Sequence, residues 1–360
     1  MRECTTTAPN VRRAFSPLDE QLSVRGRKLS EGVARLATWL SGMLTFSDAS
    51  EVLDKVGGIK VSASTVWREV QVRGERIREA EAPSKVEVIE LEEESLATTT
   101  EQRTPKRMGS SMDGGMMYIK GEGWKEAKVG VIFDVALERR LDERSKELVE
   151  VGHAVNNSYV AHLGGPAMLG ALLWKEARRR RWEEAAETVV LGDGAPWIWN
   201  LVSTHFYDSL QVVDWYHGTE HLATAAQLLY ERDPQEAQRW SEKWKTRLYQ
   251  GHAEQLAEHL TQAAAREAEA RPQKAEALQT EAGYFLTNQR RMQYMQMRED
   301  GWPIGSGMVE SGCKQFKHRF AGPGMRWSRA GAERLIPIRT AIMSNRFDAV
   351  WNRAFNSPPN

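Results

Sequence analysis

The 360-residue sequence predicts an α/β protein with a mixed sheet, a helical insertion and an all-helical N-terminal region. Three observations support this class. Apolar residues recur at helical spacing over 29–80, strand-like runs alternate with helices over 108–217, and a segment rich in Ala, Glu, Gln and Arg covers 218–298. A chain of this length can bury more than one core, so we expect two or three structural units.

The region 29–80 is expected to form three helices. Ser30 is placed to cap the first, the second covers 47–56 and ends at a glycine pair, and the third follows Ser62 or Ser64. A helix, a glycine turn and a further helix with basic outer positions outline a DNA-binding helix-turn-helix. Any small helical bundle produces the same outline, so both interpretations stay open.

The third of these helices separates core positions from surface positions. Its apolar residues Trp67, Val70 and Ile77 are expected to face inward. Its arginines are expected elsewhere on the helix, as candidate DNA contacts: Arg68, Arg73 and Arg76.

The region 108–217 is expected to hold the first part of a catalytic core. It begins with three antiparallel strands, continues with an amphipathic helix whose arginines form a solvated face, and ends with strand, helix and strand. The expected boundaries are 108–119, 124–138 and 146–155 for the first strands, 165–182 for the helix, and 187–217 for the last elements.

The remaining segments connect or extend these units. A polar tail covers 1–28, and a linker with at most one strand covers 81–107. The helical insertion over 218–298 breaks at Arg271-Pro272. The second part of the core, with a glutamate-bearing helix and a basic segment, follows over 299–345, and a tail covers 346–360.

The charge balance limits the possible partners. The formal net charge is zero, which argues against a protein that binds polyanions over its whole surface. From Ser311 to the end, however, nine Lys or Arg stand against two Asp or Glu, whereas Lys85 to Ser95 is acidic. We therefore expect the C-terminal end to face phosphates.

Two cysteines, Cys4 and Cys313, form neither a disulfide framework nor a zinc site. The sequence shows no signal peptide, and its longest apolar run, around residues 167–174, is far shorter than the ~20 residues of a membrane span. We expect a soluble cytoplasmic protein without a membrane partner.

Three acids stand at positions suited to metal chemistry. Asp113 lies within the first strand, Asp193 follows a buried strand, and Glu310 opens a late helix after Ser306. Carboxylates that converge at one end of a sheet can hold two divalent ions. Mg²⁺, or Mn²⁺ in its place, prefers such oxygen ligands. The order strand-Asp, strand-Asp, helix-Glu is the layout of an RNase H-like nucleotidyl transferase.

Basic residues follow Glu310 at helical spacing. Lys314, Lys317 and Arg319 are expected to form a cationic face that contacts phosphates beside the acids. Farther on, Arg326 and Trp327 suit either contact with the DNA backbone and an unstacked base, or a tight turn closed by a packed tryptophan.

The chain contains several dense motifs. They are SPLDEQL (16–22), SMDGG (111–115), WKEAKVG (124–130), VVLGDGAPWIWN (189–200), VVDWYHGTEHL (212–222), the set Tyr284, Phe285, Asn288, Arg291, Met292 and Tyr294, PIGSGMVESGCK (303–314) and GPGMRWSRAGAERL (322–335). In this order they resemble a known family, the bacterial insertion-sequence DDE transposases of the ISKra group, which are distantly Mutator-like. The resemblance covers the chain from about Phe15 to the end.

The resemblance implies an RNase H-like catalytic domain whose metal-binding triad is Asp113, Asp193 and Glu310. Asp214 and His217 match a signature that precedes a helical insertion in Mutator-like enzymes, which implies a supporting role. From the residues alone, His217 could equally bond a neighbouring carbonyl. The separation of 117 positions from Asp193 to Glu310 agrees with such an insertion.

The function expected is metal-dependent cleavage of DNA at element ends and strand transfer into target DNA. The partners are then element-end and target DNA, with a homo-oligomer in the complex, in a bacterial cytoplasm where the protein associates with the nucleoid. Two alternatives differ in class: a domesticated, non-catalytic DNA-binding protein, and a metal-dependent phosphohydrolase of a small substrate, which the basic C-terminal segment disfavours.

Overall fold

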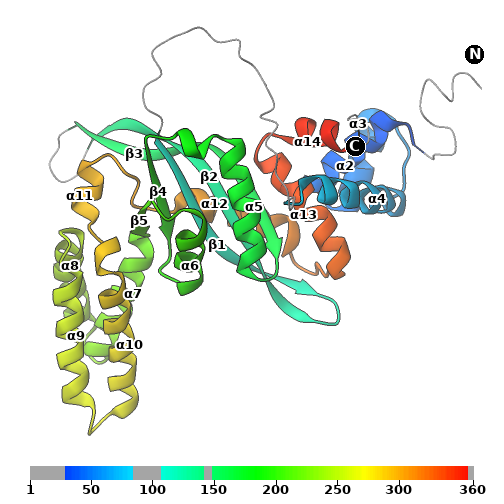
Figure 1. Cartoon of the computed structure of the whole chain (residues 1–360). Coiled ribbons are helices and arrows are strands. Elements are labelled where there is room, and N and C mark those ends of the chain that lie inside the picture. Colours follow the sequence, from blue (N-terminus) through cyan, green and yellow to red (C-terminus); the bar gives the residue numbers. More distant parts are fainter. Residues whose placement is uncertain (1–28, 84–106, 142–147, 356–360) are drawn as a thin grey trace, which may run out of the picture. The chain divides into compact units, whose positions relative to one another are not determined.

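The computed structural model describes residues 29–83, 107–141 and 148–355 (Figure 1). These residues form two compact units. The helical unit comprises 29–82, 119–121 and 319–355, and the sheet unit comprises the remainder. The expected N-terminal tail, with its SPLDEQL motif, and nearly all of the expected linker lie outside the described residues.

A five-stranded mixed sheet forms the centre of the sheet unit (Figure 1). Its order is β3-β2-β1-β4-β5; β2 and β3 pair antiparallel, whereas β1, β4 and β5 run parallel to one another. The sequence-based prediction of a mixed α/β sheet is confirmed. The strands are β1 Arg107–Ile119, β2 Gly123–Leu141, β3 Leu148–Leu163, β4 Glu187–Gly192 and β5 Leu210–Val213.

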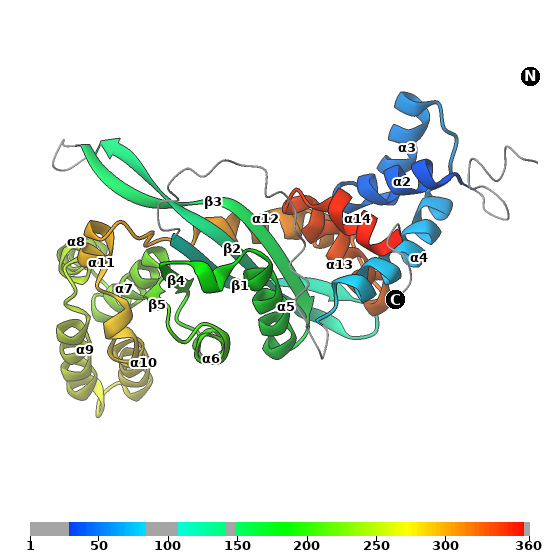
Figure 2. The same cartoon turned by 45° about the horizontal axis from the view of Figure 1, so that its top comes forward.

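Helices cover both faces of the antiparallel pair (Figures 1 and 2). Gly130 of β2 faces Leu173 of α5 (Pro166–Arg179), whereas Tyr159 of β3 faces Gly312 of α12 (Gly307–Phe320). Gly130 is paired with the neighbour of Tyr159, and successive residues of a strand point to opposite faces. The two helices therefore pack on opposite sides, which explains why the centre of β2 is buried throughout.

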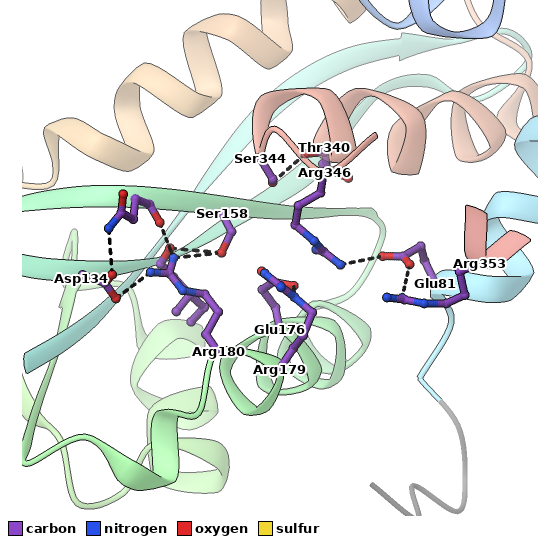
Figure 3. A network of polar contacts seen from close by, with 12 residues as sticks. Glu81, Asp134, Ser158, Glu176, Arg179, Arg180, Thr340, Ser344, Arg346 and Arg353 are labelled. Atoms are coloured by element: carbon purple, nitrogen blue, oxygen red, sulfur yellow. Dashed lines mark hydrogen bonds and ion pairs between the residues drawn. The ribbon is translucent and has the colours of Figure 1, made fainter. Parts of the chain in front are cut away.

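An arginine just after α5 is fixed to the sheet. The Arg180 guanidinium donates to the Asp134 carboxylate over 2.6 Å, to the Ile132 carbonyl over 2.7 Å and to the Ser158 hydroxyl over 3.1 Å (Figure 3). These groups surround an irregularity in the β2–β3 register between Ile132 and Asp134. Burial lowers the pKa of Arg180. The expectation that the arginines here form a solvated face is thus wrong for Arg180.

The chain between β5 and α12 is helical, as its composition predicts. Helix α10 packs along α9 and also contacts α7, and α7 contacts α8. The break expected at Arg271-Pro272 is the start of α10. The elements are α7 Trp215–Leu229, α8 Pro234–Tyr249, α9 Ala253–Glu267, α10 Pro272–Asn288 and α11 Tyr294–Glu299; α6, Pro196–His205, lies earlier, between β4 and β5.

The helical unit contains the three predicted N-terminal helices. Ser30, Thr45 and Ser62 cap them through their side-chain oxygens, and Gly58 ends the second with a φ of 64°. The second helix ends at the expected glycine pair because its C-cap residue has a left-handed conformation, which glycine adopts without strain. The elements are α2 Glu31–Met43, α3 Phe46–Gly57 and α4 Ala63–Glu81, with α13 Arg329–Met343 and α14 Phe347–Phe355 from the other end of the chain.

Two expectations about the C-terminal segment need correction. The segment expected as a tail from 346 contains α14, whose Phe347, Val350 and Trp351 are buried because they recur on one helical face. The part of the expected catalytic core from Arg319 onward belongs to the helical unit. There α13 packs closely on α4, with the Arg334 carbonyl 2.5 Å from where a Cβ at Gly74 would stand.

Among the described residues, no helix combines the length and the apolar character that a membrane crossing requires.

Candidate active site

Three carboxylates stand at the same level of three neighbouring parallel strands. The last β1–β4 pair comes two residues before Asp113 and two residues before Asp193. The last β4–β5 pair comes one residue before Asp193 and one before Asp214. Adjacent strands are ~4.8 Å apart. The sheet register therefore places Asp113, Asp193 and Asp214 at one level across the three strands, although they are far apart in sequence.

Asp193 stands in a tight loop between β4 and α6. Its Oδ1 accepts a hydrogen bond from the Ala195 amide over 2.7 Å, and Gly194 has a φ of 101°, which favours glycine. The Tyr284 hydroxyl, from α10, donates to the Asp193 carbonyl over 2.8 Å. The loop is thus held from two directions, and the carboxylate is partly exposed.

Asp113 lies in the middle of β1 against α12. Its Oδ1 accepts from the Gly114 amide over 2.6 Å, and its carboxylate also takes part in a hydrogen bond with the Cys313 thiol. Burial, together with the negative charges of Asp113 and Glu310, raises the pKa of Cys313. The thiol is therefore protonated at neutral pH and donates to Asp113. The signal in the sequence for this position of Cys313 is its i+3 spacing from Glu310.

Glu310 lies in the first turn of α12, as predicted. Its amide donates to the Ser306 carbonyl over 3.2 Å, and its side chain is about one-third exposed. Because residues three apart share a helix face, Glu310 and Cys313 stand on the same side of α12. The charges of both acids, Asp113 and Glu310, act on the Cys313 thiol.

Asp214 is fully buried and holds the two segments on either side of it. One oxygen accepts from the Ser306 amide, just before α12, in a short hydrogen bond. The other accepts from the His217 amide over 2.9 Å, which makes Asp214 the N-cap of α7, and lies 3.1 Å from His217 Nδ1. Asp214 thus ties the end of β5 to the start of the helix that carries Glu310.

The electrostatics of this pair follow from its contacts. Burial acts to raise the pKa of Asp214, but the hydrogen bonds from His217 and Ser306 outweigh it and lower that pKa. The hydrogen bond with Asp214 raises the pKa of His217 to about 9. His217 is consequently a cation at neutral pH, and its observed partner is a carboxylate rather than a carbonyl. Its charge also interacts with Asp193.

An aromatic layer lies behind Asp193. The Tyr284 ring stacks on His221 with centroids 3.6 Å apart, and His221 Nδ1 lies 2.8 Å from a Glu281 oxygen. Burial is the main cause that raises the pKa of Tyr284, so its hydroxyl remains a donor to the Asp193 loop. The resemblance named Tyr284 as a motif residue but gave it no contact.

The donor types fit a magnesium site, but the side chains are not gathered into one. Asp113, Asp193 and Glu310 supply the oxygen ligands that Mg²⁺ prefers. Over the described ranges, however, no group of three or more His, Cys, Asp or Glu side chains is close enough to hold a metal ion. The metal set Asp113, Asp193 and Glu310 therefore stays a prediction.

The expected cationic face of α12 is only partly present. Lys314 and Lys317 are exposed, and Lys314 Nζ lies 3.9 Å from a Glu310 oxygen. Lys317 Cε would be 3.2 Å from a Cβ at Gly115, close to Asp113 in β1. Arg319 is wrongly placed in the prediction: it is 2% exposed and donates to the Ser41 carbonyl over 2.7 Å in the helical unit.

Of the candidate DNA contacts on α4, two are exposed and one is buried. Arg68 and Arg76 are exposed, as a contact surface requires. Arg73 is buried and forms ion pairs with Glu31 at 3.0 Å and Glu69 at 3.2 Å, so it stabilises the helical unit instead. The sequence could not show this, because Glu31 is distant along the chain.

The GPGMRWS segment has the geometry of a closed turn. The Met325 amide donates to the Gly322 carbonyl over 3.0 Å, and the Trp327 indole donates to the Phe320 carbonyl over 2.8 Å. Gly324 has a φ of 75°. Trp327 is therefore a packed residue, whereas Arg326 is exposed.

The geometry defines a class of protein: an α/β fold with carboxylates aligned at one level of a mixed sheet and a glutamate on the helix that covers it. No family model matches the sequence, and no curated protein matches it.

Proposed function

We propose that this chain is a DDE transposase with an RNase H-like catalytic core. In the presence of Mg²⁺ or Mn²⁺, water attacks a phosphodiester at the element end and releases a 3′-hydroxyl. That hydroxyl then attacks a phosphodiester of target DNA, forms a new bond and releases the target strand's 3′-hydroxyl. The observation that carries the proposal is the alignment of Asp113 and Asp193 at one level of adjacent strands, with Glu310 in the first turn of the helix that packs on the same sheet.

The sheet supports the fold assignment. The order β3-β2-β1-β4-β5, with an antiparallel β2–β3 pair and parallel β1, β4 and β5, is consistent with an RNase H-like sheet. The helical insertion between β5 and α12 separates Asp193 from Glu310 along the chain, as the resemblance implies.

The carboxylates divide into two roles in this proposal. Asp113, Asp193 and Glu310 would hold one or two divalent ions, which supply an activated water or 3′-hydroxyl and stabilise the leaving oxygen. Asp214 has both oxygens engaged with Ser306 and His217 and positions α12. Protonated His217 adds a positive charge beside Asp193, where a phosphate would approach.

DNA contact is assigned to exposed cations. In the sheet unit, Lys314 and Lys317 lie on the helix of Glu310 and would neutralise phosphates next to the acids. In the helical unit, Arg68 and Arg76 on α4 and Arg326 are exposed candidates. A homo-oligomer on paired element ends is part of the same proposal.

One observation favours a second candidate. Because the three acids are not gathered into a metal-sized group in the part of the chain that the structure describes, a domesticated, non-catalytic DNA-binding protein is the competing proposal. It shares the cationic surface but predicts no strand cleavage in any divalent metal.

The test is strand cleavage by the full chain on labelled DNA from the borders of its gene, where inverted repeats are expected. We expect nicking at the repeat ends in Mg²⁺ or Mn²⁺ and none in EDTA. Asp113→Asn, Asp193→Asn and Glu310→Gln should each abolish it, whereas Glu258→Gln, an exposed acid of α9, should not. Wild-type cleavage by any of the three variants, or cleavage in EDTA, contradicts the enzyme proposal.

A further inference from the structure

A cavity of about 510 Å³ is lined by residues of the helical unit. Three aromatic side chains line it (Phe46, Trp67 and Trp327) together with three cations (Lys120, Arg319 and Arg326), and its lining contains no acid from the part of the chain that the structure describes. Its size is within the range of small-molecule sites. An aromatic and cationic lining without carboxylates suits a flat, negatively charged ligand.

Arg319 adds a buried positive charge to the lining of this cavity. It is 2% exposed, and while its Nε donates to the Ser41 carbonyl, its Nη2 is a buried nitrogen without a hydrogen-bond partner. The guanidinium lies 5.2 Å from the Phe46 ring centroid and 5.0 Å from that of Trp327. The buried positive charge of Arg319 thus favours a negatively charged ligand in the cavity.

Trp67 offers an aromatic surface at the same cavity. It was expected to face inward, but it is 46% exposed, whereas its neighbours Val66 and Val70 on α4 are fully buried. Trp327 forms a fixed wall, because its indole donates to the Phe320 carbonyl and its own carbonyl accepts from the Lys120 amide. This contact also holds Lys120, at the tip of the β1–β2 hairpin, beside the cavity.

We propose that this cavity binds one unpaired nucleotide of a DNA strand, with the base against Trp67 and the phosphate near Lys120 and Arg326. Bases stack on aromatic side chains irrespective of sequence, and basic residues bind the adjoining backbone. A base paired in a duplex cannot enter such a cavity, so the strand must be frayed or extruded. The identification of the ligand as DNA rests on the proposed function. The aromatic and cationic lining of the cavity is observed independently of that function.

The test uses the full chain in EDTA, so that cleavage plays no part. The probes are fluorescein-labelled duplexes of one sequence with a four-nucleotide overhang that carries either thymines or abasic spacers, and binding is followed by anisotropy. Stacking of one base contributes about 1–3 kcal/mol, so we expect a preference for the thymine overhang of roughly 5- to 150-fold. Lys120→Ala should weaken binding of both probes.

Three variants separate stacking from a general loss of structure. Trp67→Ala should remove the preference, and Trp67→Phe should retain most of it. The matched control Trp39→Ala, at a partly exposed tryptophan of α2 that does not line the cavity, should leave it unchanged. Circular dichroism checks that each variant is folded.

The next two results would overturn the cavity proposal without affecting the nuclease proposal. If wild type binds thymine and abasic overhangs equally, or an acidic peptide displaces the overhang from wild type and Trp67→Ala alike, the cavity does not hold a base. If Trp67→Ala keeps the preference, the base lies elsewhere. If Asp193→Asn loses cleavage but keeps the preference for the thymine overhang, both proposals stand. If wild type never cleaves DNA but prefers the thymine overhang, only the nuclease proposal fails.

Discussion

Asp214 uses both of its carboxylate oxygens within the protein, whereas Asp193 uses one, on the Ala195 amide. This difference assigns the two acids, which both follow parallel strands, to different tasks. The sequence supports the same assignment through the glycines around Asp193 and the bulky residues around Asp214. It could not show that Asp214 reaches Ser306, because that contact joins residues far apart in the chain.

Replacement of Asp193 and replacement of Asp214 should affect catalysis and Tm to different extents. Asp193→Asn is expected to abolish cleavage and joining with little change in Tm. Asp214→Asn should lower both rates by about 10–100-fold, as is typical of residues that position ligands. It should also lower Tm, because it weakens buried hydrogen bonds worth about 1–3 kcal/mol each.

Parallel cleavage assays in Mn²⁺, on intact and pre-cut ends, and thermal denaturation decide between the two profiles. A fully inactive Asp214→Asn with wild-type Tm, beside an active Asp193→Asn, would reverse the assignment.

The Asp214–His217 pair makes stability depend on pH in a definite direction. The folded pKa of His217, about 9, is above its ordinary value of 6.5. Its stabilising contribution is therefore complete below about pH 6.5 and is lost as the pH rises through 9. We expect the Tm of wild type to fall more steeply over this window than that of His217→Gln, as measured by scanning fluorimetry. Identical slopes would show that the pair does not contribute.

Other residues could not be placed from the sequence for the same reason. Arg73 and Arg319 carry the charge expected of DNA contacts but are buried against partners from distant segments. Conversely, Trp67 has the spacing of a core residue and is exposed. Periodicity describes one helix at a time, whereas burial depends on what packs against it.

At the scale of elements, α12 determines where Glu310 stands. Three contacts hold it: Asp214 at the Ser306 amide, the Tyr159 hydroxyl donating to the Met308 carbonyl over 3.1 Å, and Gly312 against the Tyr159 ring. Most helices and strands could be predicted from periodicity and caps. The exceptions include α13 and α14, which were not predicted as helices, and the length of β3.

A methyl group at Gly312 tests this docking. A Cβ there would overlap the Tyr159 ring, whereas a Cβ at Gly283 of α10 would meet open space. Overpacking costs about 1–3 kcal/mol, while glycine to alanine in an unobstructed helix gains about 0.5–1 kcal/mol. We expect Gly312→Ala to lower Tm and slow cleavage, and Gly283→Ala to raise Tm without affecting cleavage.

Denaturation midpoints and initial cleavage rates of both variants are the measurement. If Gly312→Ala is as stable as Gly283→Ala and cleaves at the wild-type rate, α12 is not held as described.

At the scale of the whole molecule, the helical unit is built from both ends of the chain. Helices α2 and α4 pack on α13, and α4 also packs on α14. A division of the sequence into consecutive domains assigned residues 319–345 to the catalytic core, because nothing local marks which unit a helix joins. The order of the strands in the sheet likewise could not be derived from the sequence, although the sequence did show which segments are strands and which are helices.

The charge distribution predicts how binding responds to salt. Each phosphate neutralised by a lysine adds about 0.9 to the slope of log affinity against log salt. Joint replacement of Lys314 and Lys317 by Glu should therefore reduce that slope by roughly 2. Lys243→Glu, at an exposed lysine of α8, serves as the control and should leave it unchanged. An unaltered slope in the double variant would move the DNA away from α12.

The central claim is that Asp113, Asp193 and Glu310 jointly bind the catalytic metal. It is tested most directly by titrating Mn²⁺ into the complex of full chain and element-end DNA and following the EPR signal of the free ion. We predict that wild type and Glu258→Gln remove Mn²⁺ from solution with the same affinity, and that Asp113→Asn, Asp193→Asn and Glu310→Gln each bind it far more weakly. Wild-type Mn²⁺ affinity in those three variants would contradict the account.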